Sequence, residues 1–159
     1  MLPKELSNGI CSLNPGEDRL AFSVFMTFDG EGNMIHRDFA RTVINSKARY
    51  TYEEVMALIA GGAAKCRLFS GAAGAAKTIL RISSLAQQLR ANRFAAGALD
   101  LEVSEAEVLL DSAGEMEGIV TRPYDESHQM IEECMVAANE AVAKELWAKG
   151  IKITTRLHE

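Results

Sequence analysis

Alternation of apolar and polar residues around a glycine-containing turn is the sequence feature that most constrains the fold of this chain. Between Leu20 and Phe28 every second residue is large and apolar, a pattern typical of a strand with one buried face. Asp29–Asn33 has the composition of a hairpin turn, and Met34–Ile44 reads as the returning strand, with Phe39 and Val43 among its apolar positions. The pattern predicts an antiparallel hairpin whose first strand buries Leu20, Phe22, Val24, Met26 and Phe28.

Further β structure is expected in the second half of the chain. Gly97–Leu101 begins a β region, and Ala106–Leu110 and Met116–Thr121 flank a turn sequence that predicts a second hairpin. Ile151–Leu157 is rich in β-branched residues and predicts a final strand.

Three helices are expected between these strands. Thr51 and Glu54 have the spacing of a capping box, which starts a helix that ends at Gly61-Gly62. A second helix is predicted from Ala75 to Phe94. A third is capped by Asp125 and runs to Lys149, with a core face made of Ile131, Met135, Ala138, Val142 and Leu146.

These elements predict an α+β fold in which antiparallel strand pairs pack with three helices in a single domain over residues 1–159. The opening stretch from Leu2 to Gly16 is rich in turn residues and is expected to be a loop. No apolar run is long enough to cross a membrane. Three widely spaced cysteines are expected to be reduced, mostly buried thiols in a cytoplasmic protein.

Charge is distributed unevenly along the chain, whose net charge is −5. Residues 55–99 contain no Asp or Glu but six basic residues, among them Arg81, Arg90 and Arg93. Such a segment could form a phosphate-attracting surface for RNA on an acidic protein. It could equally be a solvated basic helix paired with acidic neighbours.

Local motifs for other chemistry are weak. The glycines of the chain do not form a phosphate-binding loop. His128 and Glu132 lie one helical turn apart, but a third ligand is not evident, so no metal site is predicted from them.

The order of four longer segments resembles the catalytic domain of the ribonuclease II/ribonuclease R family, the RNB domain. Leu2–Pro15 with Arg19 resembles its LPxxLSxxxCSLxP…R stretch, and Ser46–Val55 resembles its SxAxxxYxxV segment. Gly97–Leu101 is similar to its GALDL strand, and Ile131–Asn139 to its IEExMxxAN helix. Together these segments extend over nearly the whole chain in the order of the family.

The resemblance implies a processive, hydrolytic exoribonuclease that degrades single-stranded RNA from its 3′ end. In that family an aspartate cluster binds Mg²⁺, which activates water. The cluster lies upstream of the segment that matches Leu2-Pro3, and later motifs of the family are not found here. We therefore expect an incomplete catalytic domain, the middle portion, which binds Mg²⁺ poorly and is inactive alone.

Three site residues are carried over from the resemblance. Tyr52 matches a tyrosine that lines the catalytic pocket, and Glu132 matches the glutamate that contacts the 3′-terminal sugar. Leu101 stands where some relatives have a phenylalanine that stacks on a base, and leucine provides apolar contact without stacking. Without the resemblance, Tyr52 would be read as a packed surface ring and Glu132 as part of a solvated polar stripe.

Two alternative functions remain open at this point. The first is a non-catalytic RNA-binding module that uses Arg81, Arg90 and Arg93. The second is a protein-interaction or self-associating piece, with the strand from Ile151 as the edge that pairs with another copy.

Overall fold

The protein is described by a computed structural model that covers residues 2–61, 73–99, 106–112, 114–121 and 124–154. Two antiparallel strand pairs combine with helices, which confirms the α+β prediction. In chain order the elements are η1 (Glu5–Ile10), β1 (Asp18–Phe28), β2 (Met34–Asn45), α1 (Tyr52–Gly61), α2 (Ala73–Ala95), β3 (Ala106–Leu110), β4 (Met116–Thr121) and α3 (Glu126–Ala148).

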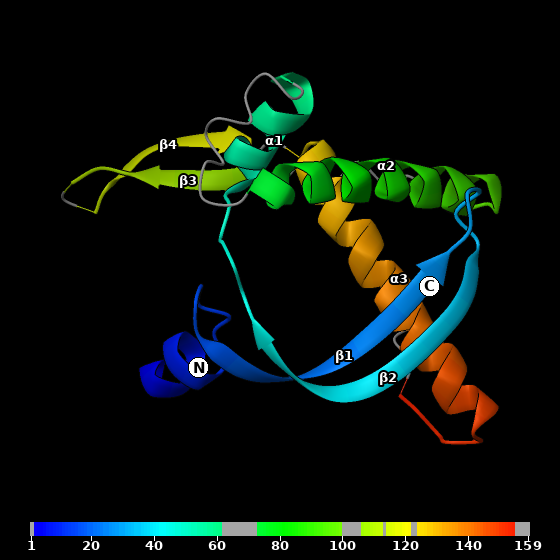
Figure 1. The fold of residues 1–159 in the computed structure, drawn as a ribbon. Coiled ribbons are helices and arrows are strands. Elements are labelled where there is room, and N and C mark those ends of the chain that lie inside the picture. The colour runs from blue at the N-terminus through cyan, green and yellow to red at the C-terminus, as the bar shows by residue number, and fades with distance from the viewer. Residues whose placement is uncertain (1, 62–72, 100–105, 113, 122–123, 155–159) are drawn as a thin grey trace.

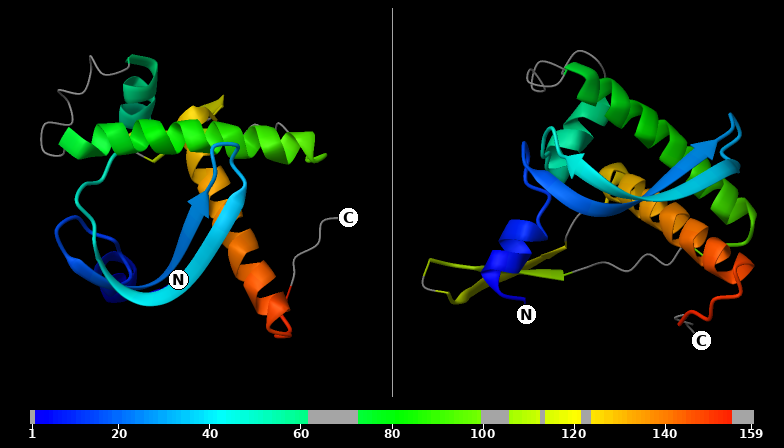
Figure 2. Two further views of the ribbon diagram at one scale, coloured as in Figure 1. Left: turned by 45° about the vertical axis from the view of Figure 1, so that its right-hand side comes forward. Right: turned by 60° about the horizontal axis from the view of Figure 1, so that its bottom comes forward.

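The three α-helices form the centre of the described structure. Figure 1 shows α2 lying across α3, while the long β1–β2 ribbon curves along α3 and the β3–β4 ribbon extends away from the helices. Figure 2 gives the same arrangement from two other directions. Two small clusters of buried side chains hold the helices together, one around Val55, Ala86 and Met130 and the other around Leu58 and Ala76.

The first hairpin forms where it was predicted. β1 pairs with β2 in an antiparallel register, and the Asp29 carboxylate closes the turn by accepting from the backbone N–H groups of Glu31 and Asn33, at 2.9 and 2.8 Å. The tip rests against α2, since Asn92 Nδ2 donates to the Glu31 carbonyl at 2.8 Å. Gly32 in this turn has φ +80°, and a Cβ there would lie 2.8 Å from Gln88 Cγ, so the turn needs glycine.

The predicted buried face of β1 is only half right. Val24, Met26 and Phe28 are partly buried, but Leu20 is 87% exposed and Phe22 is also exposed. The strand curves away from the helices towards its N-terminal end, as Figure 1 shows. The alternation therefore predicted the strand correctly, but at this end none of the described helices covers its apolar face.

The predicted core face of α3 is only partly right, because Ala138, Val142 and Leu146 are partly buried but the other two predicted residues are not. The buried residues of this helix are Ser127, Met130, Glu133 and Ala141, whereas Met135 is 59% exposed and Ile131 is exposed as well. The helix is therefore turned by about one residue from the prediction. Arg90 and Arg93 of α2 pair with Glu133, so this acid is buried between the two helices.

Three other secondary-structure predictions also need correction. The segment predicted as an opening loop contains a short π-helix, Glu5–Ile10, in which the backbone N–H groups of Leu6 and Ser7 donate to the Pro3 carbonyl. Residues 151–154 do not form the predicted final strand, and residues 155–157 lie outside the described part. The same holds for the predicted strand at 97–101: residues 97–99 are not in a strand, and 100–101 are not described.

The helix ends follow the predicted capping chemistry. Asp125 caps α3 by accepting from Ser127 N and His128 N. At the other end Gly150 has φ +68° and its N–H donates to the Trp147 carbonyl, which stops the helix. Within the described residues, no helix combines the length and apolar character needed to span a membrane. Of the thiols described, Cys134 is partly buried but Cys11 is exposed, against expectation.

Candidate nucleic-acid interface

Tyr52, the predicted pocket residue, is the first residue of α1. The capping box holds this turn: Thr51 N donates to Glu54 Oε2 at 2.7 Å, and Glu54 N donates to Thr51 Oγ1 at 3.3 Å. The Tyr52 side chain is 40% exposed and its ring stacks on the imidazole of His128, with centroids 3.8 Å apart and planes 17° apart. The start of α1 is thereby joined to the start of α3.

His128 is in turn held by the N-cap of its own helix. Its Nδ1 lies 2.9 Å from Asp125 Oδ1, and the same oxygen accepts from the Ser127 hydroxyl at 2.5 Å. Partial burial works to raise the pKa of Asp125, but hydrogen bonds from Ser127 and His128 outweigh it and hold that pKa below its usual value. Asp125 therefore stays ionised beside the imidazole.

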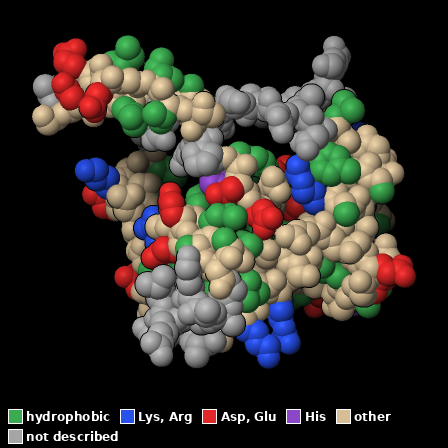
Figure 3. All heavy atoms as spheres, turned by 90° about the horizontal axis from the view of Figure 1, so that it is seen from above, with side chains coloured by type: hydrophobic (Ala, Val, Ile, Leu, Met, Phe, Trp, Pro, Cys, Tyr) green, Lys and Arg blue, Asp and Glu red, His purple; other side chains and the backbone are tan. Residues whose placement is uncertain are grey.

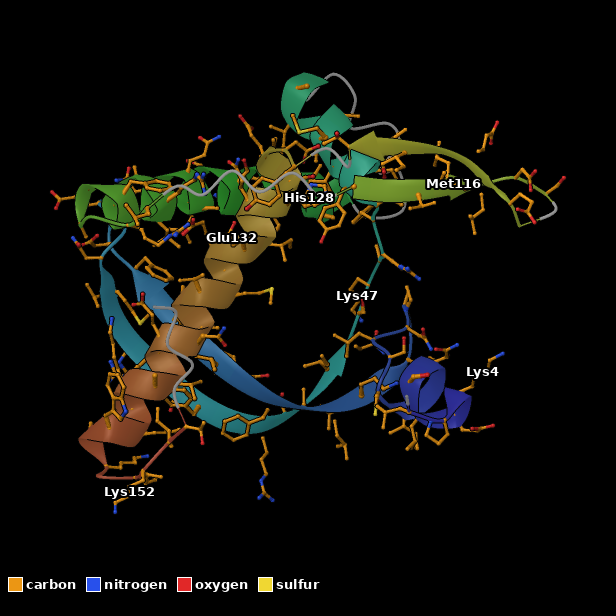
Figure 4. All side chains as sticks on the ribbon, turned by 180° about the vertical axis from the view of Figure 1, so that it is seen from behind. Lys4, Lys47, Met116, His128, Glu132 and Lys152 are labelled. Atoms are coloured by element: carbon orange, nitrogen blue, oxygen red, sulfur yellow. The ribbon has the colours of Figure 1, made fainter. Side chains whose placement is uncertain are left out.

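Glu132, the predicted sugar contact, lies one turn further along α3. The Tyr124 hydroxyl donates to Glu132 Oε2, and Arg93 Nη2 lies 3.6 Å from Glu132 Oε1. The side chain keeps 40% of its surface exposed. Figure 4 shows His128 and Glu132 following one another along the same stretch of α3. Tyr52 and Glu132 are therefore linked through two rings, since Tyr52 stacks on His128 and the Tyr124 ring lies beside His128 while its hydroxyl bonds to Glu132.

Glu133, the next residue, has a different environment. It is 2% exposed and forms a two-point ion pair with Arg93, with Nε–Oε2 at 3.2 Å and Nη2–Oε1 at 2.5 Å. Arg90 Nη1 lies 3.7 Å from the same carboxylate, and both guanidinium groups lie over the Phe94 ring. These contacts tie α2 to α3 beside the exposed Glu132.

The predicted RNA-binding arginines thus fall into two groups. Arg90 and Arg93 are engaged with Glu133, in agreement with the alternative of a basic helix that pairs with acidic neighbours. Arg81 is exposed on α2. Its contact with RNA stays a prediction, and Leu101 lies outside the described residues.

The carboxylates of this region do not fit a Mg²⁺ site. Mg²⁺ takes oxygen ligands in near-octahedral geometry, whereas Asp125 is committed to the helix cap and His128, and Glu133 to two arginines. In the described part of the chain no three His, Cys, Asp or Glu side chains are grouped so that they could hold a metal.

Tyr124 was not predicted as a member of this region, and His128 was noted from the sequence only for lying one helical turn from Glu132. For His128 the signal is its spacing of one helical turn from Glu132, which places both on one side of α3, whereas Tyr124 precedes the N-cap Asp125 and lies outside the helix. The burial of Glu133 has no such signal, since it depends on arginines of another helix.

Known proteins with this sequence pattern are ribonucleases. The chain is 40% identical to ribonuclease R of Aquifex aeolicus and 38% identical to that of Thermotoga maritima. Both alignments cover 100% of this chain and 22% of the relative, so the chain spans about a fifth of the length of the relatives it matches.

Solved structures give the same result. Mycoplasma genitalium RNase R in complex with ribose-methylated single-stranded RNA matches with a TM-score of 0.86 and 30% identity, over 99% of this chain and 24% of that chain. Its complex with double-stranded RNA also matches with a TM-score of 0.86, over 99% of this chain and 27% of that chain. A family model of the RNB domain matches residues 1–159, and with these relatives it shows that the chain belongs to the RNB domain family.

Proposed function

We propose that this chain is part of the RNA-degrading domain of a 3′-to-5′ exoribonuclease and that it holds the 3′-terminal nucleotide of single-stranded RNA at Glu132, beside Tyr52. The observation that carries the proposal is the match of the whole chain to the RNB domain and to RNase R structures that contain RNA. The contacts that link Tyr52 to Glu132 through the rings of His128 and Tyr124 support the location of the site.

The surroundings of Glu132 suit a sugar hydroxyl. Its carboxylate is partly exposed, so it can accept a hydrogen bond from a ribose hydroxyl that approaches from solvent. The Tyr124 hydroxyl and the Arg93 guanidinium hold the carboxylate from the protein side. Hydrogen bonds to a charged acceptor are stronger than those between neutral groups, so this contact would favour RNA over DNA at the terminal position.

We further propose that the chain alone binds RNA without cleaving it. The acids near the site are already committed, Asp125 to the helix cap and Glu133 to arginines, and releasing either would uncover a buried or capped group. Labelled poly(A) incubated with purified chain and Mg²⁺ is expected to stay intact. Single-nucleotide laddering that survives repeated purification would overturn this part of the proposal.

Fluorescence anisotropy tests the binding site. The probe is a 5′-labelled oligo(A) with either a ribose or a 2′-deoxyribose at its 3′ end. The unmodified chain is expected to bind the ribose form more tightly, and Glu132→Gln to weaken that binding by about tenfold and remove the preference. Glu140→Gln is the matched control, because Glu140 is exposed on the same helix and pairs only at the surface with Lys144. Equal affinity of the unmodified chain for both probes would contradict the assignment of Glu132.

A further inference from the structure

We infer that His128 is the positioning residue of this nucleotide site, because it fixes the Tyr52 ring by stacking and is itself fixed by Asp125. The role in nucleotide binding rests on the proposed function. The ring arrangement is a property of the protein without RNA and can be tested separately.

The imidazole is constrained on more than one side. Its Nδ1 is hydrogen-bonded to Asp125, one face lies against Tyr52, and the Tyr124 ring is tilted beside it with centroids 5.9 Å apart. The His128 side chain is 19% exposed, so most of its surface is covered, whereas Tyr52 is an exposed residue. The histidine therefore backs the tyrosine, and the tyrosine faces solvent.

The support behind His128 is rigid. Asp125 Oδ1 accepts from Ser127 N, Ser127 Oγ and His128 N as well as from the ring, and Ser127 is fully buried. The aspartate cannot turn without uncapping α3. A continuous series of contacts thus runs from the start of α3 through Asp125 and His128 to Tyr52.

This arrangement has a consequence for binding. A tyrosine at the first turn of a helix would otherwise sample several rotamers, and a ligand would have to order it. Stacking on a held imidazole removes that cost before the nucleotide arrives, which is the usual function of a supporting residue behind a contact residue.

The first test is NMR of the full chain without RNA. A stacked imidazole shifts the Tyr52 ring protons upfield, and His128→Gln is expected to return them to the position of an unstacked tyrosine. His128→Phe restores an aromatic face without the bond to Asp125 and is expected to recover most of the shift. His36→Gln, on β2, is the matched control and should leave the Tyr52 signals unchanged. Tyr52 signals that do not move in His128→Gln would overturn the inference.

The second test is a double-mutant cycle on the affinity for labelled oligo(A). Tyr52→Ala and His128→Gln are each expected to weaken binding by about 2- to 10-fold, the range for an aromatic pair, and together no more than Tyr52→Ala alone. Rescue of affinity by His128→Phe supports positioning, since a purely structural defect would not be rescued. Additive losses would overturn the positioning role. No loss in any variant would instead count against the nucleotide site itself, while the NMR result still decides the stack.

Discussion

Arg93 of α2 and Glu133 of α3 form a two-point ion pair in which the glutamate is almost completely buried. Removing one partner of such a pair leaves an uncompensated charge, so Arg93→Gln is expected to lower the free energy of unfolding by up to about 3 kcal/mol. Arg90 remains 3.7 Å from the carboxylate and still compensates part of its charge, so we do not expect a larger loss of stability. Urea unfolding measures it.

Lys144→Gln is the control for this prediction. Lys144 pairs with Glu140 on the exposed side of the same helix, and both side chains are more than half exposed. The change is expected to cost less than about 1 kcal/mol. Equal losses in the two variants would show that the Arg93 pair contributes no more than a surface pair.

The buried side of α3 can be mapped with two aspartate substitutions. Met130→Asp places an unpaired charge in the cluster with Val55 and Ala86 and is expected to destabilise the chain by about 4 kcal/mol or more. Met135→Asp, at a site predicted from sequence to be core, is expected to cost only about 0.5 kcal/mol because this side chain is exposed. Thermal unfolding distinguishes them, and a larger loss at Met135 would restore the sequence prediction.

The contact between the first hairpin and α2 can be tested at two glycines. Gly32→Ala and Gly16→Ala both place a side chain at a φ near +80°, which costs about 1–2 kcal/mol. A Cβ at Gly32 also meets Gln88 and Asn92, whereas nothing lies within 4 Å at Gly16. Gly32→Ala is therefore expected to be the more destabilising in urea unfolding, and equal costs would mean that the tip is not packed on α2.

Acid should weaken the start of α3 through Asp125. The pKa of this carboxyl is lower in the folded chain than its usual value of 3.8, so its ionised form stabilises the fold above that pH. This stabilisation is lost as the pH falls below the usual pKa of 3.8 and through the lower pKa that Asp125 has in the folded chain. Asp125→Asn keeps a capping oxygen. The variant is expected to be less stable than the unmodified chain at neutral pH, but to lose less of its stability between neutral pH and pH 3. Parallel stability curves for the two proteins would contradict this.

Self-association through the second hairpin is a further expectation. Val108 and Ile119 are opposite one another on β3 and β4, and both are exposed. Figure 3 shows hydrophobic side chains along this projecting ribbon. We expect concentration-dependent association in sedimentation, which Ile119→Lys reduces and Ile151→Lys does not. A single monomeric species at every concentration would contradict it.

The sequence predicted the features that depend on neighbouring residues. The Thr51 capping box, the Asp125 cap, the Gly150 stop and the turn at Asp29 each act within a few residues, and each is present in the structure. The family resemblance, which depends on the order of segments, is confirmed as well.

Features that depend on distant partners were missed. The buried side of α3 includes Glu133, which pairs with arginines about 40 residues earlier in the chain, so the apolar residues of the helix alone predicted a face turned by about one residue. The stack of Tyr52 on His128 joins two helices and has no local signature at Tyr52. The contacts between helices at the candidate site were therefore not predictable from sequence, although Tyr52, Glu132 and the Asp125 cap were named.

Glu132 and Glu133 are adjacent in the chain, yet one opens to solvent beside Tyr124 and the other is locked between arginines. Successive residues of a helix differ by about 100° around its axis. The ion pairs of Glu133 therefore fix the rotation of α3 about its own axis, and this rotation determines where Glu132 points. A change that let the helix rotate by a fraction of a turn would move Glu132 away from Tyr124 without altering any residue of the site.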